Sequence, residues 1–352
     1  MKKVLFITQK IDRNDDVLGV YHSWAEELGK KTDKLNIICL YKGECNLDKK
    51  IGVFSLGKED GVSRIKYIYR FYKYIWLLRN EYESVFVHMN PIYIALGGLF
   101  WKLAGKKIFL WYNHPMGNVM ARTAVFFSDK VFCTSPQSFF GKNKKTIIMP
   151  VGINIDVFKP KDFSTSVSNK LLFLGRISPI KKIEFLIEAI EILYLRGIDF
   201  TLLIVGSPSD SKRDIKYYED IKEKARKLVG LGRVIFKDSV SNREVVNIYN
   251  DTGLFINLTP SGSFDKTILE AMSCGLPVLV TNKVFLSIFS ESVANLLIFK
   301  DYLPTVIADK IQKIIDLKRD ERLLLRDCLR KIVVDQHSLE KLVNKLINFI
   351  ST

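Results

Sequence analysis

Residues 253–282 read GLFINLTPSGSFDKTILEAMSCGLPVLVTN, the pattern of a strand, a loop, a helix and a second strand. Leu254 to Ile256 form an apolar run typical of a buried parallel strand, and residues 276–280 form another. Proline and glycine break the pattern over 259–263, where Ser263 is the expected N-cap of the helix. The stretch predicts an α/β fold of parallel strands and connecting helices.

The loop ahead of this helix is a suitable place for a ligand. Free N–H groups and the positive end of the helix dipole meet at a helix N-terminus, where phosphates and sugar hydroxyls bind. Glu270 lies about two turns further on, and its carboxylate could accept hydrogen bonds from a diol. An ordinary strand–helix–strand unit without a ligand explains the pattern equally well.

A second motif lies upstream, at residues 171–182. An apolar run ends at Leu174 and is followed by Gly175, Arg176 and Lys181, ahead of a helical pattern over 183–195. An arginine binds two phosphate oxygens through its planar fork, and a lysine adds a point charge. The motif therefore suits a diphosphate, although basic residues near helix starts are common.

The two motifs, in this order and spacing, resemble the donor-binding segments of the retaining GT-B glycosyltransferases of glycosyltransferase family 4. The resemblance covers nearly the whole chain and implies two Rossmann-like, doubly wound parallel-sheet domains facing a cleft. It implies that Arg176 and Lys181 are catalytic and stabilise the leaving diphosphate, and that Glu270 contacts the ribose. The family's other glutamate would fall at Gly262, so its sugar-contacting role has no counterpart here. A polysaccharide-biosynthesis branch of the family is similar in reading Gly-Ser-Phe-Asp-Lys, which is 262–266 here.

The resemblance also implies contacts elsewhere. His114 follows a predicted strand and matches a histidine that contacts the donor sugar, which makes it a third catalytic candidate; a structural histidine capping a turn is the alternative. Asp12, Arg13 and Asp16 are candidates for the acceptor side, and a solvated, charged loop is the alternative. The remaining residues implied to bind the donor are Gly19, Gly206, Lys237, Ser263, Phe264, Asp265 and Lys266, of which Asp265 could instead bond its neighbours.

The length of 352 residues is comfortable for two domains. Residues 150–169 become polar and rich in Ser and Thr, as expected of a linker and hinge. We expect an N-terminal, acceptor-side domain over 1–155 and a donor-binding domain over 165–337. The resemblance implies that a last helix, 338–352, packs back on the first domain.

Basic residues are concentrated in the first half of the chain. Residues 1–160 hold 25 Lys and Arg against 14 Asp and Glu, so +11 of the net charge of +16 lies there. A positive charge of this size would suit binding to nucleic acid, to an anionic membrane surface or to phosphate-bearing molecules. Within this half, residues 64–79 predict a helix that is packed in the core with a basic solvent face, or lies on anionic lipid, or does both on different sides. Its apolar positions at helical spacing are Ile65, Ile68, Tyr69, Tyr72, Ile75 and Trp76.

The sequence lacks the motifs that are typical of several kinds of functional site. The five cysteines are scattered, without a C-x-x-C pair, which argues for a reducing, cytoplasmic compartment and against a zinc site. The sequence contains no P-loop, no complete dinucleotide fingerprint and no D-x-D metal clamp, so we expect no cofactor and no metal. The longest apolar stretch, 92–104, is interrupted by two glycines and a lysine and is too short for a membrane span.

Together with these observations, the resemblance implies a metal-independent retaining glycosyltransferase, which we expect to be cytoplasmic and peripheral on the inner face of the cell membrane. Its donor would be a nucleotide-diphosphate sugar, preferably a UDP-sugar, and its acceptor a saccharide or lipid-linked saccharide in cell-surface polysaccharide synthesis. No carboxylate nucleophile stands out, which favours same-face displacement assisted by the departing phosphate. A nucleotide-sugar epimerase or a phosphorylase on the same fold is the enzymatic alternative. A basic nucleic-acid-binding protein is the other, although no recognised motif accompanies the charge, and nucleic acid is not the expected partner.

Overall fold

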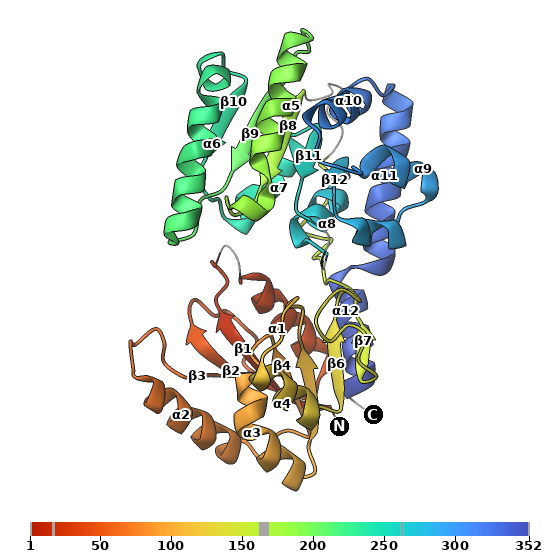
Figure 1. The fold of residues 1–352 in the computed structure, drawn as a ribbon. Coiled ribbons are helices and arrows are strands. Elements are labelled where there is room, and N and C mark those ends of the chain that lie inside the picture. Colours follow the sequence, from red (N-terminus) through yellow and green to blue (C-terminus); the bar gives the residue numbers. More distant parts are fainter. Residues whose placement is uncertain (1, 16–17, 162–168, 261, 263, 351–352) are drawn as a thin grey trace. The chain divides into compact units, whose positions relative to one another are not determined.

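The structure of the protein, a computed structural model, describes residues 2–15, 18–161, 169–260, 262 and 264–350. Its contacts divide the chain into two compact units. Unit 1 comprises Met1–Asn154 and Ser338–Thr352, and unit 2 comprises Ile155–His337. Each unit is a parallel sheet covered by helices (Figure 1), which confirms the predicted α/β class with two Rossmann-like, doubly wound domains.

The described sheet of unit 1 is parallel throughout, with the strand order β3-β2-β1-β4-β5-β6-β7. The order reverses between β1 and β4, so the carboxyl ends of these two strands flank a switch point, where open α/β sheets bind ligands. Both faces of the sheet are covered, and Val4 to Ile7 are fully buried, which explains the continuous apolar runs. The strands are β1 (Lys3–Ile11), β2 (Lys34–Lys42), β3 (Ile51–Ser55), β4 (Ser84–His88), β5 (Lys107–Trp111), β6 (Lys130–Cys133) and β7 (Thr146–Ile148).

The helices of unit 1 form two separate cores, one on each face of the sheet. The first core contains α1 (Val20–Lys31) and α12 (Leu339–Ile350). The second contains α2 (Arg64–Leu77), α3 (Ile92–Leu103) and α4 (Val119–Phe127). In the first core, Leu342 and Leu346 are buried with Trp24, and the Ser84 hydroxyl donates to the Ile350 carbonyl at 2.8 Å. The helix after residue 338 therefore completes the core of unit 1.

Unit 2 has a five-stranded parallel sheet in the order β10-β9-β8-β11-β12 within the described residues. Its strands are β8 (Lys170–Leu174), β9 (Thr201–Val205), β10 (Val234–Lys237), β11 (Leu254–Asn257) and β12 (Val278–Val280). Its helices are η1 (Pro179–Lys181), α5 (Ile183–Leu195), α6 (Lys212–Gly230), α7 (Asn242–Asn250), α8 (Lys266–Ser273), η2 (Lys283–Ser287), α9 (Glu291–Leu297), α10 (Pro304–Ile315) and α11 (Arg319–Gln336). Ser241 is the N-cap of α7, in a capping box with Glu244.

The apolar stretch near residue 92 forms α3, a helix that the sequence did not reveal. It buries Tyr93 and Ile94 but leaves Leu99 and Leu103 exposed, so its apolar residues point in several directions and give no clear period. In the described part of the chain, no helix is long and apolar enough to cross a membrane.

Helix α2 differs from the core-packed prediction. Its buried residues are Phe71 and Ile75, whereas Ile65 and Trp76 are 80% and 59% exposed. Of the apolar positions named from the sequence, Ile75 alone is buried, so the prediction chose the wrong stripe. The helix carries two apolar stripes, and the one containing Phe71 and Ile75 packs on the sheet, which leaves the other in solvent.

Candidate functional site

Two glycines, Gly175 and Gly206, lie at the carboxyl ends of the neighbouring strands β8, β9 and β10 and link these ends by hydrogen bonds. Gly175 and Gly206 follow β8 and β9 with φ of 146° and 144°. A Cβ on Gly206 would lie 2.0 Å from the Gly175 carbonyl oxygen, so only glycine fits there. The Gly206 N–H donates to the Lys237 carbonyl at 2.9 Å, which ties β10 to the same edge. Of the predicted donor residues, Gly206 and Lys237 therefore lie together.

The two predicted catalytic cations of unit 2 follow this edge and differ in their surroundings. Arg176 is exposed, and within the described residues its guanidinium has no side-chain partner. Lys181 ends the short η1 turn, and its ammonium donates to Thr259 Oγ1 and Asp265 Oδ2, both at 3.0 Å. Lys182 then adopts φ 55°, a left-handed conformation, before α5 begins. Arg176 is thus available for a ligand, and Lys181 is held in place.

Asp265 is the centre of a hydrogen-bond network that joins the two sequence motifs. One carboxylate oxygen accepts from Lys181 and from Asn257 Nδ2 at 3.1 Å, and the other from Thr267 Oγ1 at 2.8 Å. Burial alone would raise the pKa of Asp265. The Lys181 ammonium and the hydrogen bonds outweigh burial and hold that pKa below its usual value. Asp265 is therefore charged and bonds its neighbours, which was the alternative left open for it.

Asp265 is also the N-cap of α8, so the expected N-cap at Ser263 was wrong. The Asp265 carboxylate accepts from the Thr267 N–H at 3.2 Å, and α8 begins at Lys266. A carboxylate that is already fixed by Lys181 is in position to cap the helix, which shifts its start two residues onward. Ser263 itself lies outside the described residues.

Glu270 and Lys266 form an ion pair one helical turn apart on α8. The Lys266 ammonium lies 2.7 Å from Glu270 Oε1, and the Glu270 side chain is only 4% exposed. Tyr249 donates to the other carboxylate oxygen at 3.4 Å. A buried carboxylate held from two sides has a fixed orientation, as recognition of a diol requires.

Gly262 and Phe264 complete the predicted segment. Gly262 N–H donates to Asn282 Oδ1 at 3.3 Å, and a Cβ built on it would meet no atom within 4 Å. The position where the family's first glutamate would fall is thus open to a side chain. Phe264 packs edge-on against Phe285 at 5.2 Å and beside His337 at 4.8 Å, which anchors the loop ahead of α8.

His114 lies in unit 1, after β5, with its ring exposed. Its Nδ1 atom is 3.1 Å from the Met116 N–H and 3.0 Å from the Met116 carbonyl, and the tautomer decides which of the two it bonds. The structure therefore contains the turn contact of the structural alternative. Because that contact uses Nδ1, the Nε2 edge of the ring is left for a ligand.

The loop between β1 and α1 is held by its own ion pairs. The Lys10 ammonium lies 3.1 Å from Asp12 and 2.6 Å from Asp15, so Asp12 is tied to the sheet edge and is not a freely solvated residue. Arg13 is exposed, and Asp16 lies outside the described residues. A Cβ on Gly19 would lie 2.5 Å from the Asp15 carbonyl, so this glycine serves the packing of the loop itself.

Comparison with known proteins identifies the second half of the chain. Residues 155–327 match the family model described as glycosyl transferases group 1. This segment belongs to that family. The matched stretch of a probable sucrose-phosphate synthase of Thermosipho melanesiensis is 30% identical over 143 residues, 39% of this chain and 32% of that protein. A D-inositol 3-phosphate glycosyltransferase of Mycolicibacterium smegmatis is 31% identical over 136 residues, 36% of this chain and 30% of that protein. The chain therefore matches about a third of the length of these curated relatives.

Solved structures show the same fold over the whole chain. HepE of Anabaena, crystallised with UDP and glucose, has a TM-score of 0.75 at 15% identity and covers 100% of both chains. The group 1 transferase segment corresponds to unit 2, and it contains the Gly175–Gly206 edge and the Asp265 network.

Sequence reasoning missed a buried aromatic cluster in unit 1, which does not belong to the group 1 transferase segment. His88 ends β4 at the switch point, with its ring centroid 4.1 Å from that of Tyr21 and 5.5 Å from that of Trp24. Burial lowers the pKa of His88 to about 3, so the ring is neutral at physiological pH. The next residue, Met89, has φ 62°, which is rare for a non-glycine residue. The one available signal in the sequence was the position of His88 directly after the apolar run 85–87.

The group 1 transferase segment contains side chains whose chemistry suits an anion and a diol. Arg176 and Lys181 supply positive charge, and Glu270 supplies an oriented carboxylate. Across the described residues, no group of three or more His, Cys, Asp and Glu side chains is placed to hold a metal ion.

Proposed function

We propose that the protein is a retaining glycosyltransferase, which moves a sugar from a nucleotide-diphosphate donor to a saccharide or lipid-linked saccharide. The observation that carries the proposal is the single network, within the group 1 transferase segment, that links Lys181 to the loop before α8 through Asp265. It brings the two sequence motifs, which lie 78 to 84 residues apart, to one sheet edge.

In the proposed reaction, the bond between the sugar C1 and the diphosphate oxygen breaks, and a bond from the acceptor oxygen to C1 forms on the same face. The acceptor proton passes to the departing diphosphate, which gains the bonding electron pair. Arg176 and Lys181 stabilise the negative charge that develops on this leaving group. Lys181 is already oriented by Thr259 and Asp265, so little reorganisation is needed at the moment of reaction. His114 is the proposed contact of the transferred sugar.

The proposed donor is a UDP-sugar, with the ribose diol on Glu270. Support comes from the fixed orientation of Glu270 between Lys266 and Tyr249. The similarly folded HepE of Anabaena was solved with UDP and glucose, which makes UDP the first nucleotide to test.

The proposed location is the inner face of a membrane, where the protein would lie on anionic lipid and act in cell-surface polysaccharide synthesis. Support comes from the second core of unit 1, whose helices leave large apolar side chains in solvent: Ile65, Tyr69 and Trp76 on α2, Leu99 and Leu103 on α3, and Val119 and Phe126 on α4. Arg79 lies over the Trp76 ring at 4.4 Å, and Tyr72 donates to the Leu96 carbonyl at 3.0 Å, so the apolar stripe of α2 borders α3. Aromatic residues beside cations are typical of surfaces that lie at lipid headgroups.

Thermal unfolding against a panel of UDP, GDP, TDP and CMP tests the donor site. A nucleotide that binds only the folded state stabilises it by about 2.7 kcal/mol at 100 times its dissociation constant. We expect one diphosphate to raise the Tm of the parent and of an Arg213→Ala control, since Arg213 is an exposed arginine of α6. The Arg176→Ala and Glu270→Ala variants should lose the shift.

A donor that is consumed only with a saccharide acceptor present would then separate transfer from epimerisation, which needs no acceptor, and from phosphorolysis, which needs phosphate. If no nucleotide changes the Tm of the parent, the proposal fails.

A further inference from the structure

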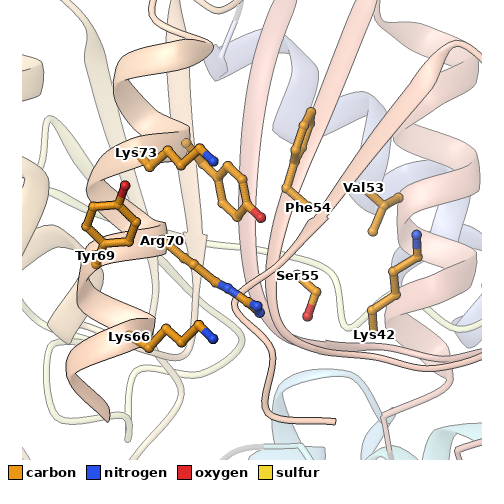
Figure 2. Close-up of a pocket in the computed structure, with 9 residues that line it drawn as sticks. Lys42, Val53, Phe54, Ser55, Lys66, Tyr69, Arg70 and Lys73 are labelled. Carbon is orange, nitrogen blue, oxygen red and sulfur yellow. The ribbon is translucent and has the colours of Figure 1, made fainter. Parts of the chain in front are cut away.

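A second candidate site lies in unit 1, at helix α2. A pocket of ≈ 530 Å³ is formed between α2 and the adjoining parts of β2 and β3 (Figure 2). We call it the α2 pocket; its lining residues are Lys42, Val53, Phe54, Ser55, Lys66, Tyr69, Arg70, Lys73 and Tyr74. Four of the nine are cations and none is a carboxylate, so the pocket is strongly basic.

The cations of α2 occupy one face of the helix. Lys66, Arg70 and Lys73 are spaced by four and three residues, which places them on consecutive turns. Figure 2 shows the side chains of Lys66 and Arg70 extending from α2 toward Ser55. Like charges at this spacing destabilise a helix by a few tenths of a kcal/mol, unless an anion lies between them.

Among the described residues, a carboxylate pairs with only one of the four cations of the pocket, Arg70. Within the described residues, the ammonium groups of Lys42, Lys66 and Lys73 have no ion-pair or hydrogen-bond partner. Glu59 approaches Lys42 only through the backbone, accepting its N–H at 3.2 Å. Asp60 forms an ion pair with Arg70 Nη1 at 3.4 Å, but its side chain is 58% exposed, so the pair is weak.

The guanidinium of Arg70 is fixed by the loop after β3. Nη1 donates to the Leu56 carbonyl at 3.1 Å. Gly57 has φ 95°, and a Cβ there would lie 1.9 Å from Arg70 Nη1, so the loop needs glycine for the guanidinium to fit. These contacts use Nη1, which leaves Nε and Nη2 as donors for a ligand, since no described residue accepts from them. An arginine oriented in this way is suited to the paired oxygens of a phosphate.

The walls of the pocket are aromatic and continue toward the exposed apolar stripe of α2. The rings of Phe54 and Tyr74 pack with centroids 5.3 Å apart. Tyr69 lines the pocket and is also one of the exposed apolar side chains beside Ile65. A ligand with a charged group in the pocket could therefore lay an apolar part along α2.

We infer that the α2 pocket binds a phosphate group, held by the Arg70 fork and the ammonium groups of Lys42, Lys66 and Lys73. Taken with the transfer activity proposed above, on which this step rests, the phosphate belongs to the acceptor. The same chemistry has two sources, a soluble phosphate ester or the headgroup of an anionic lipid.

Two binding measurements on the full chain distinguish these sources. Calorimetric titration with glycerol 3-phosphate reports a soluble ester, and co-sedimentation with vesicles of phosphatidic acid in phosphatidylcholine reports a headgroup. The Lys66→Gln/Lys73→Gln variant removes two charges from the pocket. Its matched control, Lys142→Gln/Lys144→Gln, removes two exposed charges of unit 1 that do not line the pocket.

We expect the pocket variant to bind at least one probe about tenfold more weakly than the control, which corresponds to about 1.4 kcal/mol. Weakening with both probes supports a phosphate site open to soluble esters, and weakening with vesicles alone supports a lipid headgroup. Equal binding by the two variants, or no binding of either probe by the parent, overturns the inference. An Arg70→Lys variant keeps the positive charge but loses the planar fork. It should therefore bind the phosphate probes more weakly than the parent, although the charge of the pocket is unchanged.

The nucleotide-dependent shift in Tm reports unit 2 separately. Its absence in the parent would remove the assignment of the phosphate to an acceptor, whereas phosphate binding in the α2 pocket would stand on its own measurement.

Discussion

Two groups of cations in this chain are built in opposite ways. In unit 2, Lys181 and Lys266 each lie within 3.0 Å of a carboxylate, and the carboxylates of Asp265 and Glu270 are 19% and 4% exposed. In the α2 pocket, Lys66 and Lys73 are exposed and have no such partner among the described residues. A paired lysine has a fixed position and a partly neutralised charge. It is therefore best suited to stabilise negative charge that develops on a ligand already bound beside it. An unpaired lysine attracts a charge that arrives with the ligand, and its effect depends on salt.

The largest effect should come from Arg176, for whose guanidinium no described residue is a partner. We expect Arg176→Ala to lower the rate of sugar transfer about 100- to 1,000-fold, as for other groups that stabilise developing charge. Arg176→Lys should recover part of this loss, because it keeps the charge without the fork. Steady-state kinetics with the donor found in the thermal panel is the measurement. Full activity in Arg176→Ala would show that Arg176 does not stabilise the negative charge on the leaving diphosphate.

Next in size is the loss of the carboxylate that holds Lys181. Asp265→Asn should destabilise unit 2 by about 1–3 kcal/mol at pH 7, because the partly buried ammonium loses its counter-charge. The pKa of Asp265 is depressed in the folded protein, so its contribution is present above the unfolded value of about 3.9 and is lost as the pH falls through the lower native pKa.

Urea unfolding of the parent and of Asp265→Asn, at pH 7 and at steps below pH 4, measures both effects. The two proteins should converge in stability at the acid end. Parallel pH profiles would show that Lys181 does not depend on this carboxylate.

The salt dependence of binding compares the two groups directly. Raising NaCl from 0.05 to 0.5 M shortens the Debye length from about 14 to about 4 Å. We expect glycerol 3-phosphate to bind the α2 pocket about tenfold more weakly over this range, and the nucleotide to lose only about twofold in unit 2. Equal losses at the two sites would remove the distinction drawn between paired and unpaired lysines.

The smallest effect on stability should follow Gly262→Glu. A Cβ there meets nothing within 4 Å, and Gly262 is not among the positive-φ glycines, so we expect a change within about 0.5 kcal/mol. The informative readout is the choice of donor sugar in competition between UDP-sugars. A large loss of stability would mean that this position is closed to a side chain, contrary to the open space around Gly262.

The sequence predicted the strand that ends at Leu174 and the helix over 183–195 well, because both have strong local causes. The glycine turn at Gly175 acts over a few residues and follows β8 as expected. The N-cap of α8 was missed because Asp265 is fixed by Lys181, a contact across 84 residues that no local pattern contains.

In unit 1 the errors have a different origin. Helix α2 has two apolar stripes, and choosing between them requires knowing which one meets the sheet. The α2 pocket was equally hidden, because Lys42 and Ser55 join the cations of α2 only when β2, β3 and the helix are packed. Its one local clue was the spacing of Lys66, Arg70 and Lys73, which also fits an ordinary solvated face.

The position of α12 has a consequence for how the chain is made. Residues 338–350 follow unit 2 in the sequence but supply Leu342, Leu346 and Ile350 to the core that also holds Phe6 and Trp24. During translation, the residues of unit 1 that leave the ribosome first must wait, with one apolar face uncovered, until all of unit 2 has been synthesised. Unit 2, whose segment is continuous, has no such delay. The order of folding is therefore expected to run against the order of synthesis, and chaperone binding should concentrate on the early product.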